Sequence, residues 1–155
     1  MLKSTTFFLI CTLFSLQLYA QCVPDEDYIP LGANYGLSPD TLTIAYVNQS
    51  YNQDLTFVLP LDTLVEIEGS GETLIAFEDY HITSISLPIG LPWECNNSED
   101  NCHYNPTISQ YGCVNLYGVP LEYGEFNVDV TVVATHELSW AVGTEEISFS
   151  LPLSI

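Results

Sequence analysis

The chain has 155 residues and a formal net charge of −19, with 20 Asp and Glu against a single Lys or Arg. That basic residue is Lys3, so the chain after it has every acidic side chain and no Lys or Arg at all. Because Lys and Arg provide the affinity for nucleic-acid phosphates and for anionic lipid surfaces, the composition argues against both partners. It favours a solubilising acidic surface and stays compatible with cationic partners.

Residues 1–20 have the pattern of a secretory signal peptide. Lys3 provides the positive start, an apolar run follows from Phe7 to Leu18, and Ala20 offers a small residue for cleavage. The run is too short to span a membrane, so we expect no membrane insertion after signal removal. A lipid anchor on Cys22 is the alternative, but Gln21 stands where a small residue would be expected. We therefore predict a protein that is secreted or displayed at the cell surface.

After the signal peptide, residues 21–40 are rich in Pro, Gly, Asp and Asn, and we expect an irregular lead-in. A domain of short strands follows over residues 41–155, because apolar and β-branched runs there are separated by turn residues. Gly69, Ser70 and Gly71 fit a hairpin turn between two of these strands. The predicted strands cover 41–47, 55–59, 64–68, 73–77, 81–87, 93–95, 114–117, 125–135, 138–142 and 145–155.

The clearest strands come late in the chain. From Phe126 to Ala134 and from Ile147 to Ile155, apolar residues alternate with polar ones at a period of two. This pattern indicates a sheet with one face packed on a core, and many short strands of this kind indicate an all-β sandwich. Because the last predicted strand runs to Ile155, we expect a domain that is truncated or followed by further chain.

Four cysteines remain after the signal peptide, namely Cys22, Cys95, Cys102 and Cys113. In an exported protein an even set predicts disulfides, here two. We prefer Cys95–Cys113, which would staple a hairpin, together with Cys22–Cys102; a local Cys102–Cys113 bridge is the main rival. A thiolate zinc site that includes His103 is a less favoured alternative.

Three motifs carry a family resemblance. The segment from Val47 to Phe57, the turn Leu87-Pro-Ile-Gly-Leu, and the segment from Gly118 to Val128 resemble bacterial immunoglobulin-like domains of the He-PIG, cadherin-like type. The cysteine-bearing insert resembles exported proteins of bacteria that use type IX secretion. The resemblance implies an immunoglobulin-like β-sandwich over residues 41–135. Asn48 and Val119 depart from the usual Gly and Thr of these motifs, and the sequence given contains no sorting domain from which surface attachment could be expected.

The turn and strand residues have structural interpretations of their own. Gly90 and Gly118 are expected to supply positive φ at turns. Trp93, Tyr123 and Phe126 are expected to be the large core groups of this region. The loop of residues 96–112 lies between Cys95 and Cys113. It is then the segment that is free to contact a partner.

Candidate ligand-binding residues lie in and beside that loop. Tyr104, Tyr111 and Trp93 are aromatic groups of the kind that stack on sugars or anchor protein partners. Glu99, Asp100 and Asn101 offer oxygen atoms that suit calcium, although no complete calcium motif is present. The sequence has no nucleophile elbow, metalloprotease motif or phosphate loop, so no catalytic residue and no other cofactor are predicted.

The favoured hypothesis is therefore an exported, non-catalytic immunoglobulin-like module for adhesion, binding or spacing, with a protein or glycan partner at the cell surface. A carbohydrate-binding accessory module of a secreted hydrolase is the second hypothesis. A small secreted enzyme is the third and the least favoured.

Overall fold

The computed structural model describes residues 21–30, 35–67, 71–138 and 141–155. The predicted signal peptide, and Gly69 and Ser70 of the predicted hairpin turn, lie outside these residues. Almost every regular element is a strand, with one short 3-10 turn, η1 (Ser98–Asp100). The strands are β1 (Gly36–Ser38), β2 (Tyr51–Val58), β3 (Asp62–Ile67), β4 (Gly71–Ser86), β5 (Trp93–Cys95), β6 (His103–Tyr104), β7 (Tyr111–Gly118), β8 (Glu125–Leu138) and β9 (Ala141–Ser154).

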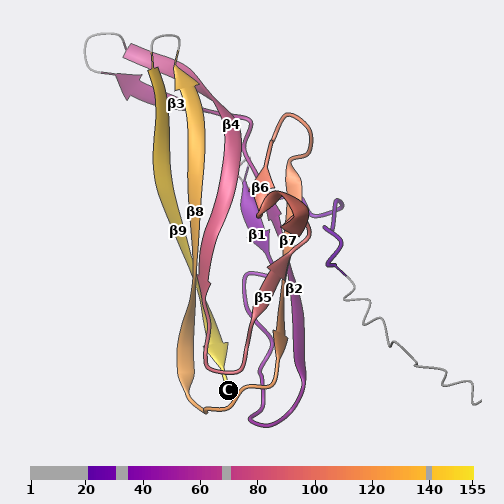
Figure 1. The fold of residues 1–155 in the computed structure, drawn as a ribbon. Coiled ribbons are helices and arrows are strands. Elements are labelled where there is room, and N and C mark those ends of the chain that lie inside the picture. Colours follow the sequence, from indigo (N-terminus) through magenta and orange to yellow (C-terminus); the bar gives the residue numbers. More distant parts are fainter. Residues whose placement is uncertain (1–20, 31–34, 68–70, 139–140) are drawn as a thin grey trace, which may run out of the picture.

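The strands form two facing antiparallel sheets (Figure 1). Sheet A has the order β1-β2-β7-β5, and sheet B has the order β3-β4-β8-β9, with β6 beside β4. With β3 and β6 set aside, seven strands remain. Counted along the chain, sheet A has the first, second, fifth and fourth of them (β1-β2-β7-β5), and sheet B has the third, sixth and seventh (β4-β8-β9). This is the strand arrangement of a constant-type immunoglobulin domain. The predicted all-β, immunoglobulin-like sandwich with two disulfides is confirmed.

The predicted alternation of β8 and β9 is confirmed by burial. Val128, Val130, Val132 and Ala134 of β8 lie in the core, as do Leu151 and Leu153 of β9. The two strands pair along their whole length, from Glu125 opposite Ser154 to Leu138 opposite Ala141. Their apolar side chains therefore share the inner face of sheet B, as period-two alternation requires.

Two glycines hold one end of the sandwich together, as predicted. Gly90 has φ +97° and Gly118 has φ +123°, both in the region that favours glycine. A Cβ atom on Gly90 would meet the Val119 carbonyl oxygen, because the Val119 amide donates to the Gly90 carbonyl at 3.0 Å. The two turns therefore pack backbone against backbone, with no room for side chains.

Five sequence expectations are wrong. The predicted strand 138–142 is not a separate strand, because Leu138 ends β8 and Ala141 begins β9. Residues 41–47 are not a strand: Leu42 and Ala45 are buried, but the pairing is reduced to one bond, from the Ala45 amide to the Ser154 carbonyl. The lead-in is not wholly irregular, because β1 pairs with β2. Predicted strands 73–77 and 81–87 are joined in β4, whose register shifts absorb the interruption. Tyr123 is 85% exposed and contributes nothing to the core.

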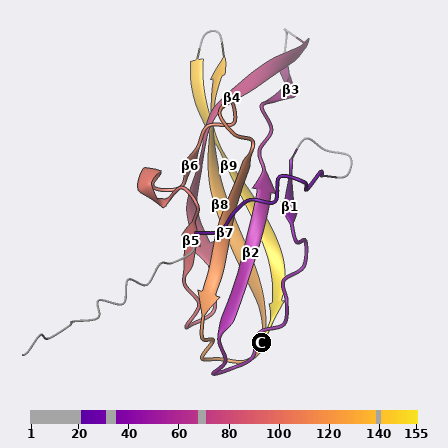
Figure 2. The same cartoon turned by 90° about the vertical axis from the view of Figure 1, so that its right-hand side faces the viewer.

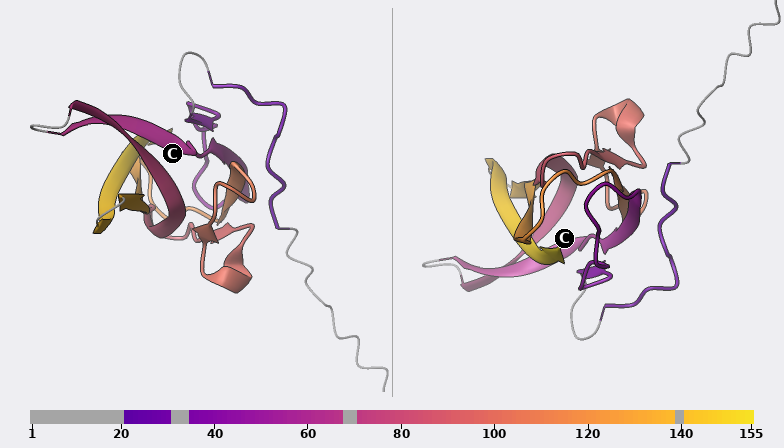
Figure 3. Two further views of the ribbon diagram at one scale, coloured as in Figure 1. Left: turned by 90° about the horizontal axis from the view of Figure 1, so that it is seen from above. Right: turned by 90° about the horizontal axis from the view of Figure 1, so that it is seen from below.

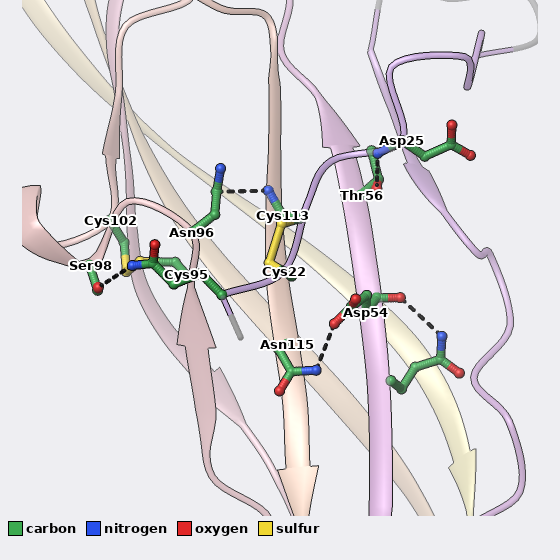
Figure 4. The surroundings of a disulfide bond; sticks show 12 residues. Cys22, Asp25, Asp54, Thr56, Cys95, Asn96, Ser98, Cys102, Cys113 and Asn115 are labelled. Atoms are coloured by element: carbon green, nitrogen blue, oxygen red, sulfur yellow. Dashed lines mark hydrogen bonds between the residues drawn. A yellow bond between two sulfur atoms is a disulfide. The ribbon is translucent and has the colours of Figure 1, made fainter. Parts of the chain in front are cut away.

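The preferred disulfide pairing and its main rival are also wrong. The bonds are Cys22–Cys113 and Cys95–Cys102 (Figure 4). Strands β5 and β7 do pair, as the hairpin hypothesis required, but Cys95 lies opposite Val114. Neighbouring residues of a strand point to opposite faces, so Cys95 faces the core beside Val114 while Cys113 faces away from it. A one-residue difference in register therefore decides the connectivity.

The outward-facing Cys113 binds an N-terminal strap, residues 21–30. Figure 2 shows this segment crossing the outer face of sheet A, over β7 and β2. The Asp25 amide donates to the Thr56 hydroxyl at 2.9 Å, and the Tyr111 hydroxyl donates to the Tyr28 carbonyl at 3.2 Å. The strap therefore crosses the outer face of sheet A, and the inner face packs in the core.

Candidate functional site

The sandwich has two long lateral edges, and they differ. At one, which we call the closed edge, β5 is the end strand of sheet A and β6 pairs with β4 of sheet B. Cys95 ends β5 and Cys102 precedes β6, so the Cys95–Cys102 bond links the two sheets there. At the other, which we call the open edge, β1 of sheet A faces β9 of sheet B.

Hydrogen bonds reinforce the closed edge. The Asn96 side-chain oxygen accepts from the Tyr104 hydroxyl at 2.9 Å and from the Cys113 amide at 3.0 Å. The Tyr104 ring packs edge-on against Phe57, with ring centroids 5.0 Å apart. Burial raises the pKa of the Tyr104 phenol to about 12, although a backbone hydrogen bond at Asn97 opposes the shift. Loop 96–112 is thus anchored to the core.

The three predicted aromatic ligand-binding residues do not form one exposed surface. Tyr104 is only 6% exposed and packs in the core, where it also lines the groove described below, so its role as a binding group stays a prediction. Tyr111 is half-buried and holds the strap through its hydroxyl. Trp93 is half-buried and packs against the core from β5. Each of the three side chains is used for packing or for strap attachment within the protein itself.

The predicted calcium residues lie at η1. Glu99, Asp100 and Asn101 are exposed, and Asn101 ends the turn in the left-handed conformation. Among the described residues, no group of three or more His, Cys, Asp or Glu is arranged to hold a metal ion. Calcium binding stays a prediction.

The zinc alternative is wrong, because Cys95 and Cys102 are bonded to each other. His103 instead contacts a carboxylate: its Nδ1 atom lies 2.8 Å from Asp79 Oδ2. The His103 ring also stacks on His81, with centroids 3.9 Å apart. Stacked rings present their faces rather than their nitrogen atoms to each other, so the pair supports the closed edge and is not a chelating site.

The open edge holds an apolar groove, which sequence analysis did not identify. Figure 1 shows β4, β8 and β9 reaching beyond β1 and β2 at the end remote from the C-terminus, so sheet A does not cover all of sheet B. The groove between the sheets encloses about 790 Å³. Leu64 and Leu74, which are 62% and 58% exposed, lie at its outer end. Its walls include Leu37, Leu55 and Phe57 of sheet A and Val130, Val132 and Ile147 of sheet B.

Two carboxylates, Asp62 and Glu145, line this apolar groove. Glu145 precedes Ile147 and Phe149 on the inward-facing side of β9, and it is exposed. Its charge reaches Tyr80 inside the groove, where burial first and the Glu145 charge second raise the pKa of the phenol. The Tyr80 hydroxyl donates to the Pro60 carbonyl at 3.0 Å. The site therefore combines apolar walls with negative charge at its mouth.

At its lower end the open edge is closed. There the Ala45 amide donates to the Ser154 carbonyl at 3.0 Å, and Leu42 and Ala45 enter the core. Seen end-on in Figure 3, the two sheets form separate layers, with the strap outside one of them. An apolar ligand with a cationic group fits this arrangement, because the walls exclude polar groups and the mouth attracts positive charge.

One sequence signal could have indicated the groove. Glu145 interrupts the apolar face of the predicted strand 145–155, which is otherwise continued by Ile147 and the alternate residues after it. A carboxylate on a core-facing position indicates that the core ends there or that the site is open to solvent. The divergence of the two sheets is a tertiary property, and no local pattern encodes it.

Comparisons with known proteins identify no relative in sequence. No protein-family model and no curated protein matches the chain, so the He-PIG resemblance stays a prediction. Among solved structures, the VesB protease of Vibrio cholerae is 11% identical with a TM-score of 0.44; the match covers 79% of this chain and 32% of the protease. A human domain, the ASH/PapD-like domain 7 of CEP192, is 10% identical with a TM-score of 0.40, over 87% of this chain and 94% of that one. Neither similarity bears on function.

Among the described residues, no helix is long and apolar enough to cross a membrane.

Proposed function

We propose that the chain is an exported, non-catalytic binding module of immunoglobulin-like fold, which takes an apolar, positively charged group of its partner into the open-edge groove. The observation that carries this proposal is the groove itself, an apolar space of about 790 Å³ with Glu145 and Asp62 on its lining. This volume lies within the range of about 300–1,000 Å³ that is typical of small-molecule sites.

Charge selects the ligand class. No Lys or Arg is present after Lys3, so no such residue among those described can neutralise Glu145 or attract an anion. An anionic head group would meet Glu145, Asp62 and the acidic surface around them. A cationic head group would be attracted, while its apolar tail replaces water along Val130, Val132 and Ile147.

The cellular setting follows from the cysteines and the first residues. Two disulfides are typical of a protein that matures in an oxidising compartment. With the predicted signal peptide, they support secretion or display at the cell surface, with adhesion to a protein or glycan partner as the role. Export by type IX secretion is part of the same proposal and rests on the family resemblance alone.

The carbohydrate-binding alternative loses its main support. It required Tyr104, Tyr111 and Trp93 to share an exposed face, whereas Tyr104 is buried and the other two are half-buried. No observation favours an enzyme over a binding module, and we propose no catalytic role.

Three ligands with one tail test the proposal. Octylamine, octanol and octanoate share an apolar chain and differ in head-group charge at neutral pH. In methyl NMR titrations we expect octylamine to bind tightest and octanoate weakest, with shifts at Val130, Val132 and Ile147. Equal affinities for octylamine and octanoate, or shifts confined to other residues, would overturn the proposal.

Two matched variants locate the charge effect. Glu145→Gln removes one of the two carboxylates that line the groove, so the preference for octylamine over octanol should become smaller. Glu99→Gln removes an exposed carboxylate of η1, and the order of the three ligands should stay unchanged. The same result for both variants would mean that the net charge, and not Glu145, selects the ligand.

A further inference from the structure

The outer side of β9 is an unpaired sheet edge next to the groove. β9 is the last strand of sheet B and pairs with β8 alone. Among the described residues, the backbone hydrogen bonds at this end of sheet B other than those to β8 are the bond from Ala45 to Ser154 and the pair between Gly124 and Ile155. From Thr144 to Pro152, the outward-facing amides and carbonyls of β9 are therefore available to another strand.

The lower end of the same edge already accepts an extended segment. Residues 41–47 descend from β1, place Leu42 and Ala45 in the core and donate the Ala45 amide to Ser154. Above this point the chain leaves the edge, and the groove begins. At its lower end, β9 thus already pairs with a backbone segment of this chain whose apolar side chains enter the core. Above that point, no described segment of the chain pairs with the outer edge of β9.

The geometry of β9 matches strand addition rather than the entry of an isolated apolar molecule. Glu145, Ile147 and Phe149 alternate on the groove side of the strand, and Glu146 and Ser148 lie on the other side. A strand added to β9 has the same period of two, so every second side chain would enter the groove. Main-chain bonds would supply affinity, and the groove would supply selectivity.

Charge decides between a partner and a second copy of this chain. Glu145 and Glu146 are adjacent in the exposed part of β9, and Pro152 removes one amide from its edge. Two β9 edges would bring like charges together, and acidic side chains and Pro are common protections of an edge against self-pairing. A basic strand would instead bring opposite charges together.

We propose, resting on the function proposed above, that the partner is a protein segment that adds to β9 as an extended strand, with alternate apolar side chains in the groove and Lys or Arg on the opposite face, beside Glu146. The partner is thus a basic, extended peptide. A compact cationic molecule would fill the groove without pairing with β9.

A synthetic peptide tests strand addition. We would add a peptide of about nine residues with alternating Val and Lys, and measure amide hydrogen exchange over residues 144–150. Outward-facing amides of β9 should exchange about tenfold more slowly or less at saturation, while β5, the edge strand of sheet A at the closed edge, stays unchanged. Two control peptides keep the same side chains. In each of them every second backbone amide is N-methylated, so that one peptide has one of its two hydrogen-bonding edges blocked and the other peptide has the opposite edge blocked. The peptide whose blocked edge faces β9 should lose about tenfold or more in affinity.

The outcomes separate the two proposals. Octylamine binding without peptide protection of β9 overturns strand addition and leaves the groove as a ligand site. Failure of both octylamine and the peptide overturns both. A peptide of alternating Val and Glu is the charge control. If it protected the β9 amides as strongly as the basic peptide does, the proposed role of charge would be contradicted. Glu146→Lys should weaken the basic peptide, and Glu99→Lys should weaken it less.

Discussion

The two lateral edges of one sandwich are finished in different ways. At the closed edge, a disulfide joins the sheets. The Asn96 side chain accepts hydrogen bonds from the Tyr104 hydroxyl and from the backbone amide of Cys113. At the open edge, the Ala45 amide donates to the Ser154 carbonyl at the lower end, and above it the apolar walls of the groove stay apart. The strand order is shared with other immunoglobulin-like domains, so the fold alone does not distinguish these edges. The side chains at each edge determine which one is available for binding.

The comparison also separates stability from function. Polar groups of the closed edge are paired inside the protein, which leaves little for a ligand to replace. The open edge keeps unpaired strand backbone, apolar surface and a carboxylate together, and each of these is costly unless a partner uses it. Stability should therefore be concentrated at the closed edge and the strap, and ligand binding at the open edge.

The largest expected effect comes from removing disulfides one at a time. Cys22–Cys113 spans 91 residues and Cys95–Cys102 spans 7. On a chain-entropy model, the Cys22→Ser/Cys113→Ser variant should lose about 4–5 kcal/mol of unfolding free energy, and Cys95→Ser/Cys102→Ser about 2–3 kcal/mol. Denaturant unfolding measures both. Octylamine binding at the open edge should survive loss of Cys95–Cys102, and its loss in a folded variant would contradict the independence of the two edges.

Replacing either of two valines on the same face of β8 with Phe compares the cost in stability in the packed core with the cost in the groove. Val128 is fully buried in the lower, closed part of the core, whereas Val132 lines the groove four residues further along β8. Val128→Phe should cost about 1–3 kcal/mol by overpacking, and Val132→Phe less than about 1 kcal/mol, because the ring fills empty space. Chemical denaturation measures the stabilities. Val132→Phe should also weaken octylamine; equal destabilisation by both changes would contradict a groove.

Alkaline pH should weaken the closed edge. The ordinary phenol pKa is 10.0, and burial raises that of Tyr104 to about 12. Below about pH 10 the phenol is protonated in both folded and unfolded chains, so stability is unaffected; between pH 10 and 12 the unfolded chain ionises first and stability falls. Tyr80 adds to this loss in the same direction. The loss should be smaller in Tyr104→Phe and unchanged in Tyr123→Phe, as followed by unfolding at each pH.

The smallest effect is that of salt on the folded chain. Twenty acidic residues without Lys or Arg after Lys3 repel one another, and salt screens that repulsion. The thermal midpoint should therefore rise with NaCl. A midpoint that stays flat up to about 1 M NaCl would indicate little self-repulsion. Octylamine affinity should fall over the same range, because its attraction to Glu145 is screened.

The features predicted correctly are those that a local pattern determines. Alternation over β8 and β9 identified the inward residues, and the Gly90 and Gly118 turns follow from backbone conformations that other residues rarely adopt. β1 could not be predicted, because its three residues are too few for a period. The disulfide pairing depended on the register that places Cys95 opposite Val114, and a turn-based argument does not fix that register.

Tyr104 and the groove show a second limit. A tyrosine in a loop rich in Asn and Asp is expected to be exposed. The Tyr104 hydroxyl instead donates to Asn96 of the same loop, and its ring packs against Phe57 of β2, which is distant in the sequence. The groove arises where β4, β8 and β9 extend beyond β1 and β2, which depends on strand lengths in two sheets at once. Only Glu145, an acid on an apolar face, marked the site in the sequence.

Xenon binding tests the open edge most directly, because a neutral atom reports apolar space without help from charge. In methyl NMR under xenon pressure, signals of Val130, Val132 and Ile147 should shift and saturate, while those of Val128 and Leu153 stay unchanged. Absence of shifts at the first three residues, or equal shifts at all five, would contradict an accessible groove between β1 and β9.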